Sequence, residues 1–238
     1  MVPIWNMKAR RGMSLHWDGL SASLREVVLS SALGDGASRT SILLPNLARI
    51  EQWLMDVQPP AYPYDVDKGL AAEGRGVYDA QCAACHAAGG ARTGTVVPVE
   101  EVGTDRHRID MWTPAAPVAY NKYTDGYPYD FSGFRKTGGY VAVPLDGVWL
   151  RAPFLHNGSV PSLQELLDLP AGRRQTFYRG YDVFDPVRVG FISEGDVAAR
   201  AGTLYDTRLP GNSNAGHLYG VELSPAQKKA LIEYLKML

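Results

Sequence analysis

Apolar residues recur at three-and-four spacing in several parts of the chain, a pattern that predicts amphipathic helices. In LPNLARIEQWLMD, residues 44–56, five of them share one face: Leu44, Leu47, Ile50, Trp53 and Leu54. Upstream, SASLREVVLSSALG predicts another helix, with Ser21 or Ser23 as N-cap and Gly34 near its C-terminal end. We therefore expect two helices in the first part of the chain.

The most complete helix signal lies at the end of the sequence, in SPAQKKALIEYLKML. Ser224 is a suitable N-cap, Pro225 follows at the first helical position, and Gln227 completes a capping box. Its apolar face comprises Ala230, Leu231, Tyr234, Leu235 and Leu238. Such a helix needs a partner that covers this face.

A partner is available in DKGLAAEGRGVYDAQC, where apolar residues follow a helical register that runs into Cys82. Gly74 and Gly76 would let a second helix cross closely, because glycine has no side chain in the way. We expect Leu231 or Tyr234 of the last helix to fill that crossing.

A proline cluster divides the chain into two unequal pieces. In VQPPAYPYDV, Pro59, Pro60 and Pro63 fix backbone angles and remove amide donors, which predicts an extended connector. We expect a helical segment at residues 1–60 and a larger domain at 61–238. The larger piece adds a short helix at 162–169 and two loops, about 92–145 and about 170–223, with no persistent strand pattern. The predicted fold class is mostly α, with long loops.

Composition and charge exclude some partners. The chain is 45% hydrophobic and 21% charged, with a formal charge of −1, so neither nucleic acid nor an anionic membrane surface is expected to bind. No apolar run is long enough to span a membrane, and MVPIWNMKARRGMSLHWDG at the start lacks the apolar region of a secretory signal.

The chemistry is concentrated in GVYDAQCAACHAAGG, which holds both cysteines of the chain, Cys82 and Cys85, followed by His86. In C-x-x-C-H, two thiols one helical turn apart can each add to one vinyl group of a haem, while the imidazole reaches the iron. One covalent haem c therefore accounts for all three residues.

Other interpretations of the pair stay open. A redox C-x-x-C pair is expected near a βαβ pattern, which the sequence lacks. Zinc needs four ligands and would have to recruit a distant histidine. A structural pair of cysteines is the remaining alternative.

A c-type haem has a second axial position, whose occupant decides between electron transfer and catalysis. Six residues are candidates for it: His16, His107, His156, His217, Met111 and Met237. His217 is favoured because it lies in LPGNSNAGHLYGVELSPAQ, a glycine-rich loop just before the last helix. His156 precedes a helix start, where a histidine often serves backbone groups instead.

Two other features carry less weight. The segment YNKYTDGYPYDFSGFRKTGGY, residues 120–140, is rich in aromatic rings, which predicts a loop that packs by its own rings; a wall beside the haem is the alternative. Asn157-Gly158-Ser159 matches a glycosylation acceptor, a pattern that is common by chance.

Three segments together resemble the bacterial di-haem cytochrome c peroxidase superfamily, and most closely the branch that contains the rubber oxygenases: QCAACH, YVAVPLDGVWLRAPFLHNGSVPSLQELL and GNSNAGHLYGVELSPAQKKALIEYLKML. The resemblance implies a cytochrome c fold for residues 61–238, with haem on Cys82 and Cys85 and His86 as proximal ligand. In the rubber oxygenase branch a histidine binds the other face, which corresponds to His217. Trp149 and Arg151 are then candidates to line the haem or bind its propionates.

The same resemblance implies what this chain lacks. These families have two haem domains, and residues 1–60 look like the end of the first one without its C-x-x-C-H. We therefore expect either a mono-haem electron-transfer protein or the C-terminal fragment of a haem peroxidase or oxygenase. The expected partners are a redox protein or an upstream haem domain, or peroxide, oxygen or an apolar substrate. Haem attachment of this kind implies a periplasmic or secreted bacterial protein, and the absence of a signal peptide agrees with a fragment or a mature chain.

Overall fold

Helices are the main regular structure of the chain, joined by long loops. The computed structural model describes residues 3–238, so the first two residues of the predicted segment 1–60 lie outside it. Helices take 37% of the chain and strands 10%. The expectation of a mostly α fold is therefore confirmed in part: helices outweigh strands, but loops make up a large share of the chain. In residues 3–238 we find no helix that is both long and apolar enough to cross a membrane.

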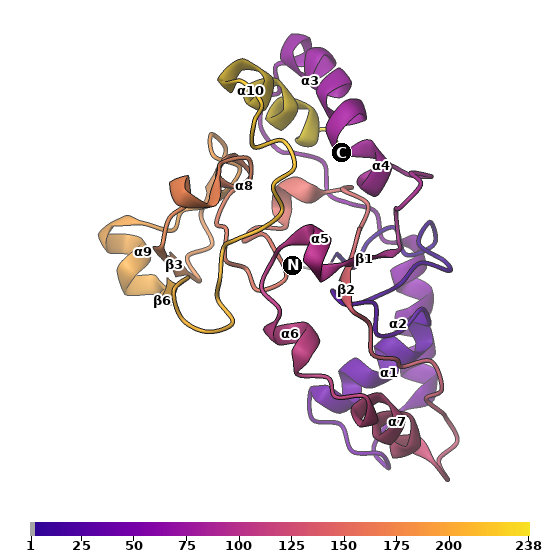
Figure 1. Ribbon diagram of the computed structural model, residues 1–238. Helices are drawn as coiled ribbons and strands as arrows, with labels where there is room; N and C mark the ends of the chain where they lie inside the picture. Colours follow the sequence, from indigo (N-terminus) through magenta and orange to yellow (C-terminus); the bar gives the residue numbers. More distant parts are fainter. Residues whose placement is uncertain (1–2) are drawn as a thin grey trace.

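Two helices from distant parts of the sequence pair at one end of the molecule (Figure 1). They are α3, Lys68–Gln81, and α10, Pro225–Leu235. The predicted capping box at Ser224 and Gln227 is present, which confirms the start of α10. Gly74 faces the backbone of Ala230, as the predicted close crossing requires. Gly76 faces open space, so its predicted part in that crossing is wrong.

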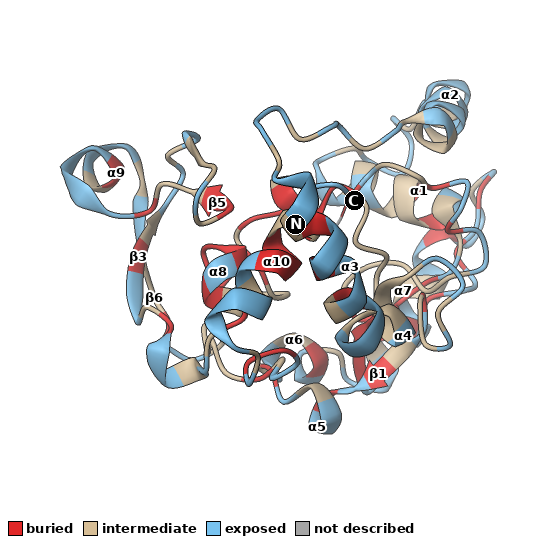
Figure 2. Cartoon of the chain, turned by 90° about the horizontal axis from the view of Figure 1, so that it is seen from above, coloured by how far each residue is buried: buried red, intermediate tan, exposed pale blue. Residues whose placement is uncertain are grey.

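The main core lies under α10 and extends to α8, Leu163–Leu166 (Figure 2). Leu231 is completely buried in this core, and the rings of Tyr78 and Tyr234 lie 5.1 Å apart, so both predicted residues fill the crossing. Helix α8 is shorter than the predicted 162–169, since Ser162 is its N-cap and Leu169, which precedes Pro170, has an extended conformation.

The predicted helices of the first segment are present as α1, Leu24–Gly34, with Ser23 as N-cap, and α2, Leu44–Asp56. A second core joins this segment to the aromatic loop, since Leu20 and Leu29 pack with the loop's rings: Tyr129, Phe131 and Phe134. The loop's rings also pack on one another, Phe131 on Phe134 at 5.1 Å and Tyr127 on Tyr129 at 6.0 Å, as expected of a loop that packs by its own rings. The domain boundary near residue 60 stays a prediction.

Three small antiparallel sheets of two strands each were not predicted. The pairs are β1, Val96–Pro98, with β2, Gly139–Val141; β3, Thr176–Arg179, with β6, Thr203–Asp206; and β4, Phe184–Asp185, with β5, Gly190–Phe191. Strands of two to four residues are too short to display an alternating pattern. The first sheet matters for function, because it borders the candidate site.

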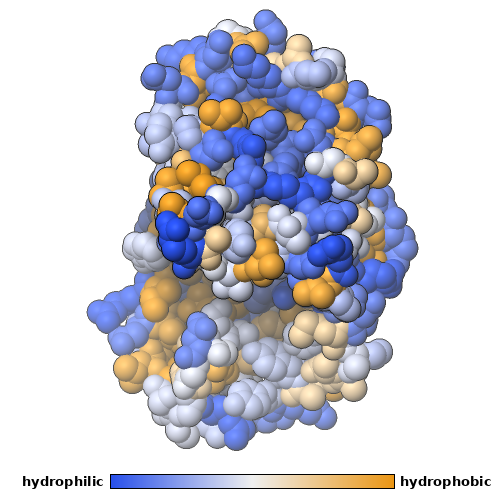
Figure 3. All heavy atoms as spheres, turned by 90° about the vertical axis from the view of Figure 1, so that its left-hand side faces the viewer, coloured by the Kyte–Doolittle hydropathy of each residue, from blue (hydrophilic) through white to orange (hydrophobic). Residues whose placement is uncertain are grey.

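Short helices complete the chain. They are α4, Ala83–His86; α5, Val99–Val102; α6, His107–Asp110; α7, Ala115–Asn121; α9, Gly195–Ala201; and three 3-10 helices, Lys122–Thr124, Val148–Leu150 and Pro170–Gly172. The lobe formed by α9 and the β3–β6 pair lies away from α1 and α2, and its outer face mixes hydrophilic and apolar side chains (Figures 1 and 3).

Candidate functional site

The two cysteines and His86 form one helical turn at the end of α3. Cys82 is the last residue bound to that helix, and its carbonyl accepts from the backbone N–H groups of Cys85, at 3.2 Å, and His86, at 3.0 Å. Both thiols are free and half-buried, and all three side chains line one cavity. Burial, and then the nearby Cys85, raises the pKa of Cys82 to about 11, so its thiol is protonated at neutral pH. Reactive C-x-x-C pairs have the opposite shift.

A hydrogen bond fixes the tautomer of His86. Its Nδ1 lies 2.7 Å from the carbonyl oxygen of Val143, and since a carbonyl only accepts, Nδ1 carries the hydrogen. The lone pair therefore resides on Nε2. Burial lowers the pKa of His86, which keeps the ring neutral. A neutral imidazole with its other nitrogen held by a carbonyl is the usual form of a metal-binding histidine.

His217 faces His86 across the cavity. The two ring centres are 6.3 Å apart, and the ring planes are inclined at 43°. Burial, followed by the nearby His86 and Arg173, lowers the pKa of His217 to about 3, so this ring is neutral as well. Its Nδ1 is buried without a hydrogen-bond partner. The pair is too far apart for direct contact, but one metal ion about 2 Å from a nitrogen of each ring would account for the gap.

The cavity between the rings measures about 390 Å³ and is largely apolar. Its aliphatic walls come from the first sheet, α5, α8 and α10, and include Val97, Val102, Leu163 and Leu231. Two facing neutral imidazoles, two thiols on one rim and apolar walls are what a covalently bound haem requires. The residues of this site therefore fit the group that the sequence predicts.

The other five candidate ligands lie elsewhere or are otherwise engaged. Met111 and Met237 are exposed, and His107 lies on the surface beside Asp105. His16 lines a different cavity. His156 does line the same cavity, but Tyr140 occupies it: the rings stack at 4.1 Å.

Tyr140 connects His156 to the backbone. Its hydroxyl lies 2.6 Å from the carbonyl oxygen of Asp105 and 3.0 Å from Nε2 of His156. Since the carbonyl only accepts, Tyr140 donates its single hydrogen there and accepts from the Nε2–H of His156. Burial lowers the pKa of His156 to about 4. This histidine is thus a neutral donor in a structural network, and its partner is the side chain of Tyr140 instead of the backbone group expected from its position before a helix.

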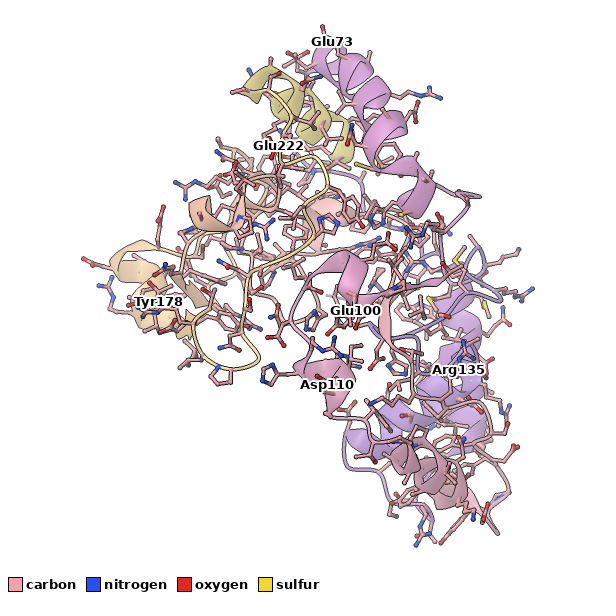
Figure 4. All side chains as sticks on the ribbon, viewed as in Figure 1. Glu73, Glu100, Asp110, Arg135, Tyr178 and Glu222 are labelled. Atoms are coloured by element: carbon pink, nitrogen blue, oxygen red, sulfur yellow. The ribbon has the colours of Figure 1, made fainter. Side chains whose placement is uncertain are left out.

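The loop that carries His217 runs between α8 and α5 (Figure 1). In Figure 4 it descends from the labelled Glu222, which precedes α10, and passes beside Glu100 of α5. The backbone N–H of His217 donates to the carbonyl of Val102 at 2.8 Å. Gly216, with a φ of 78°, lies against the backbone of Gly103, where any side chain would collide. The ligand loop is therefore fastened to α5.

Sequence reasoning missed a residue that fastens the start of this loop. The side-chain amide of Asn157 donates to the carbonyls of Gly211, at 3.1 Å, and Ser213, at 2.9 Å. In the sequence, the triplet Asn157-Gly158-Ser159 matches only a glycosylation pattern that is common by chance, which gives no sign of this role. The carbonyl of Val143, which orients His86, carries no signal in the sequence at all.

Arg151 and Trp149 have different surroundings. Arg151 lines the cavity, and its guanidinium and that of Arg10 approach the carboxylate of Asp146 at 3.8 and 2.9 Å. Burial, and then Arg10, lowers the pKa of Arg151 to about 9. Trp149 packs in the core beside the rings of Tyr62 and Phe184, and its indole N–H donates to the carbonyl of Pro60 at 3.1 Å.

A second cavity of about 500 Å³ is lined by residues from 3–17, from α1 and α2, and from 141–144. His16 lines it, with its Nε2 buried and without a hydrogen-bond partner. Trp17, Val141 and Val143 line both cavities, so the two are neighbours. Within residues 3–238, no group of three or more His, Cys, Asp or Glu residues is arranged to hold a metal ion.

Comparison with known families agrees with this geometry. Residues 139–179 match the family model described as "RoxA-like, cytochrome c-like". This segment begins at β2 and includes Arg151, His156 and Asn157. The match confirms the predicted resemblance to the rubber oxygenase branch and indicates a cytochrome c-like, haem-binding domain.

Two curated relatives come from Sinorhizobium fredii. The chain is 30% identical to uncharacterized protein y4iM, over 98% of this chain and 63% of that protein. It is 29% identical to uncharacterized protein y4iJ, over 79% of this chain and 42% of that protein. The chain thus spans less than two thirds of the length of either relative.

Proposed function

We propose that this chain is a c-type cytochrome domain that passes single electrons through one covalently bound haem with two histidine ligands, His86 and His217. The observation that carries the proposal is the 6.3 Å separation of these two neutral rings across an apolar cavity. The cytochrome c-like match of residues 139–179 supports haem as the group between them.

Each part of the site has a role in this proposal. The haem supplies one-electron exchange at its iron. Each thiol adds across one vinyl group, so that sulfur bonds to one carbon, the thiol hydrogen goes to the other, and no atom is lost. The carbonyl of Val143 holds the proximal ring at Nδ1, and the fastened loop holds the distal ring. The apolar walls exclude water, and Arg151 provides a positive charge inside the cavity for a propionate.

Two occupied axial positions favour electron transfer over catalysis, because they leave no open site for peroxide or oxygen. The partner would be a redox protein or a further haem domain. The attachment chemistry belongs outside the bacterial cytoplasm, so a periplasmic or secreted location is part of the proposal.

Absorption and paramagnetic resonance spectra of the purified protein, combined with its intact mass, test the proposal. We expect the mass of one haem to be retained after denaturation, and a low-spin ferric signal. Cys82→Ala together with Cys85→Ala should abolish covalent haem, and His217→Ala should give a high-spin signal. His107→Ala, a change at an exposed histidine, is the control. A colourless protein, or a wild type that is high-spin, would refute the proposal.

A second candidate function is that of a haem peroxidase or oxygenase of which this chain is one part. It is favoured by the second cavity beside Trp17, in which the Nε2 of His16 has no partner, and by the greater length of the relatives. Turnover of hydrogen peroxide with an electron donor, or of oxygen with an apolar substrate, would support it, provided that His86→Ala abolishes the turnover.

A further inference from the structure

Arg173 is a buried arginine whose guanidinium binds backbone carbonyls on two sides. The residue is 3% exposed and follows the 3-10 helix Pro170–Gly172. On one side its Nε donates to the carbonyl of Asp168 at 2.9 Å and its Nη2 to that of Leu166 at 3.3 Å. On the other side its Nη1 donates to the carbonyls of Gly216, at 3.0 Å, and Asn214.

These partners connect α8 to the loop of the distal histidine. Leu166 ends α8, and Asp168 follows it, so their carbonyls belong to the helix end, where negative charge accumulates. Asn214 and Gly216 belong to the loop, and Gly216 immediately precedes His217. The guanidinium therefore spans the gap between a fixed element and the residue next to the ligand.

The neighbouring carboxylates serve other cations. Asp168 is paired with Lys228 at 3.4 Å, and Glu165 is paired with Arg174. Burial lowers the pKa of Arg173, while Asp168 and Glu165 raise it from a distance. A buried charge is retained only where it is well hydrogen-bonded, and here the carbonyls of the backbone do this.

We propose that Arg173 is a positioning residue that keeps His217 on the iron. The consequence at the iron rests on the proposed bis-histidine haem. The hydrogen bonds from Arg173 to the loop do not depend on the haem. Without the guanidinium, two carbonyls of a glycine-containing loop lose their donors, and the ring gains freedom to leave. Arg173 thus keeps the sixth position closed to external ligands.

Arginine is suited to this task in a way that lysine is not. Four N–H groups in one plane reach carbonyls on opposite sides, whereas the three donors of lysine radiate from one atom. We therefore expect Arg173→Lys to restore only part of the hold, and Arg173→Met, of similar length but without donors, to lose it. The control is Arg174→Met, because Arg174 directs its side chain to Glu165 and Glu194 instead of the loop carbonyls.

The experiment compares the full-length haem protein with these three variants by two measurements. Amide hydrogen exchange of residues 211–217 reports on the loop, and the rate of carbon monoxide binding to the ferrous protein reports on the open sixth position. In Arg173→Met we expect both to rise roughly tenfold or more, since several charge-assisted hydrogen bonds are lost. Arg173→Lys should lie between this variant and wild type, and Arg174→Met, which removes no donor from the loop carbonyls, should raise both rates clearly less than Arg173→Met does.

The outcomes separate this inference from the proposed function. A high-spin wild type refutes the bis-histidine haem, and faster exchange in Arg173→Met would then still support the hold on the loop. A low-spin wild type with the same exchange and carbon monoxide rates in Arg173→Met and Arg174→Met overturns the inference. If Arg173→Met does not fold, the exchange and carbon monoxide rates of Arg173→Lys are compared with those of Arg174→Met instead. Amide exchange in α3 serves as the reference, because it rises only if the whole protein is destabilised.

Discussion

Gly74 of α3 lies against the carbonyl of Ala230 in α10, with no room between them for a β-carbon. The contact joins the helix that ends in the two cysteines to the helix that follows the ligand loop. The geometry of the candidate site therefore depends on a residue that has no side chain.

We expect Gly74→Ala to lower the free energy of unfolding by about 1–3 kcal/mol, because the added methyl group must push backbone apart. Gly76→Ala is the matched control in the same helix. Its β-carbon meets open space, so it should stabilise the protein by about 0.5–1 kcal/mol through the higher helix propensity of alanine. Urea unfolding of both variants measures the difference, and equal effects would contradict the close crossing.

The carboxylate of Glu26 holds the aromatic loop to α1. It accepts from Oγ of Ser21 at 2.7 Å and from the backbone N–H groups of Ser132 and Gly133, both at 2.8 Å. Burial raises its pKa, but these hydrogen bonds outweigh burial, and the net pKa is lowered. The resulting stability is present above its unfolded pKa and is lost as pH falls through the lowered value.

Glu26→Gln should therefore cost about 2 kcal/mol at pH 7, because an amide nitrogen replaces an oxygen that accepts hydrogen bonds. Glu73→Gln, on the exposed side of α3 (Figure 4), is the control and should have little effect. Urea unfolding at pH 7 and pH 3 tests both points, since the gap between Glu26→Gln and wild type should narrow at the lower pH. An unchanged gap would exclude the carboxylate as the cause.

Half-buried histidines make the protein sensitive to mild acid. The pKa of His156 is lowered to about 4 by burial, while in the unfolded chain it has its ordinary value near 6.5. Between these values the unfolded state binds the proton more readily, so stability is highest above about pH 6.5 and falls as pH drops toward 4. His16, which is also half-buried, has a pKa lowered in the same direction and by the same cause.

We expect His156→Gln to flatten this dependence between pH 7 and pH 5, although the variant is less stable at pH 7 because its stack on Tyr140 is lost. His107→Gln, at an exposed position, should follow wild type across the range. The measurement is the midpoint of urea unfolding as a function of pH. A profile of His156→Gln parallel to that of wild type would rule out His156 as a source of the acid sensitivity.

The choice of distal ligand should determine the redox potential. In the proposed haem protein, His217→Met replaces a nitrogen ligand by a thioether, which raises the potential within the roughly 0.8 V range that axial ligands span. His107→Met introduces the same side chain at the surface and should leave the potential unchanged. Spectroelectrochemical titration measures both variants, and a His217→Met protein with the wild-type potential would mean that residue 217 does not bind the iron.

The sequence predicted what depends on side-chain identity and local pattern. Helices α1, α2, α3 and α10 have periodic apolar faces, α1, α3 and α10 also have capping side chains, and C-x-x-C-H is a compact motif, so all of these were found. The short strands lacked enough residues to produce a pattern.

The hydrogen bonds that hold the site in place could not be predicted for a different reason. Most of them involve backbone carbonyls, such as those of Val143, Val102 and Gly216, and a carbonyl is the same in every residue. The two side chains that donate to carbonyls of the ligand loop, Asn157 and Arg173, have no spacing relation to that loop in the sequence. Only the fold brings these groups together.

The contact between Gly103 and Gly216 has a consequence for the order in which the protein matures. His217 can reach its place only after the turn that follows α5 has formed, because its own N–H and the preceding glycine both rest on that turn. The thiols of Cys82 and Cys85, by contrast, are brought together by one helical turn. In the proposed haem protein, the thiols could therefore be attached before distal ligation, and His217 would meet the iron only once its loop had docked on the turn after α5.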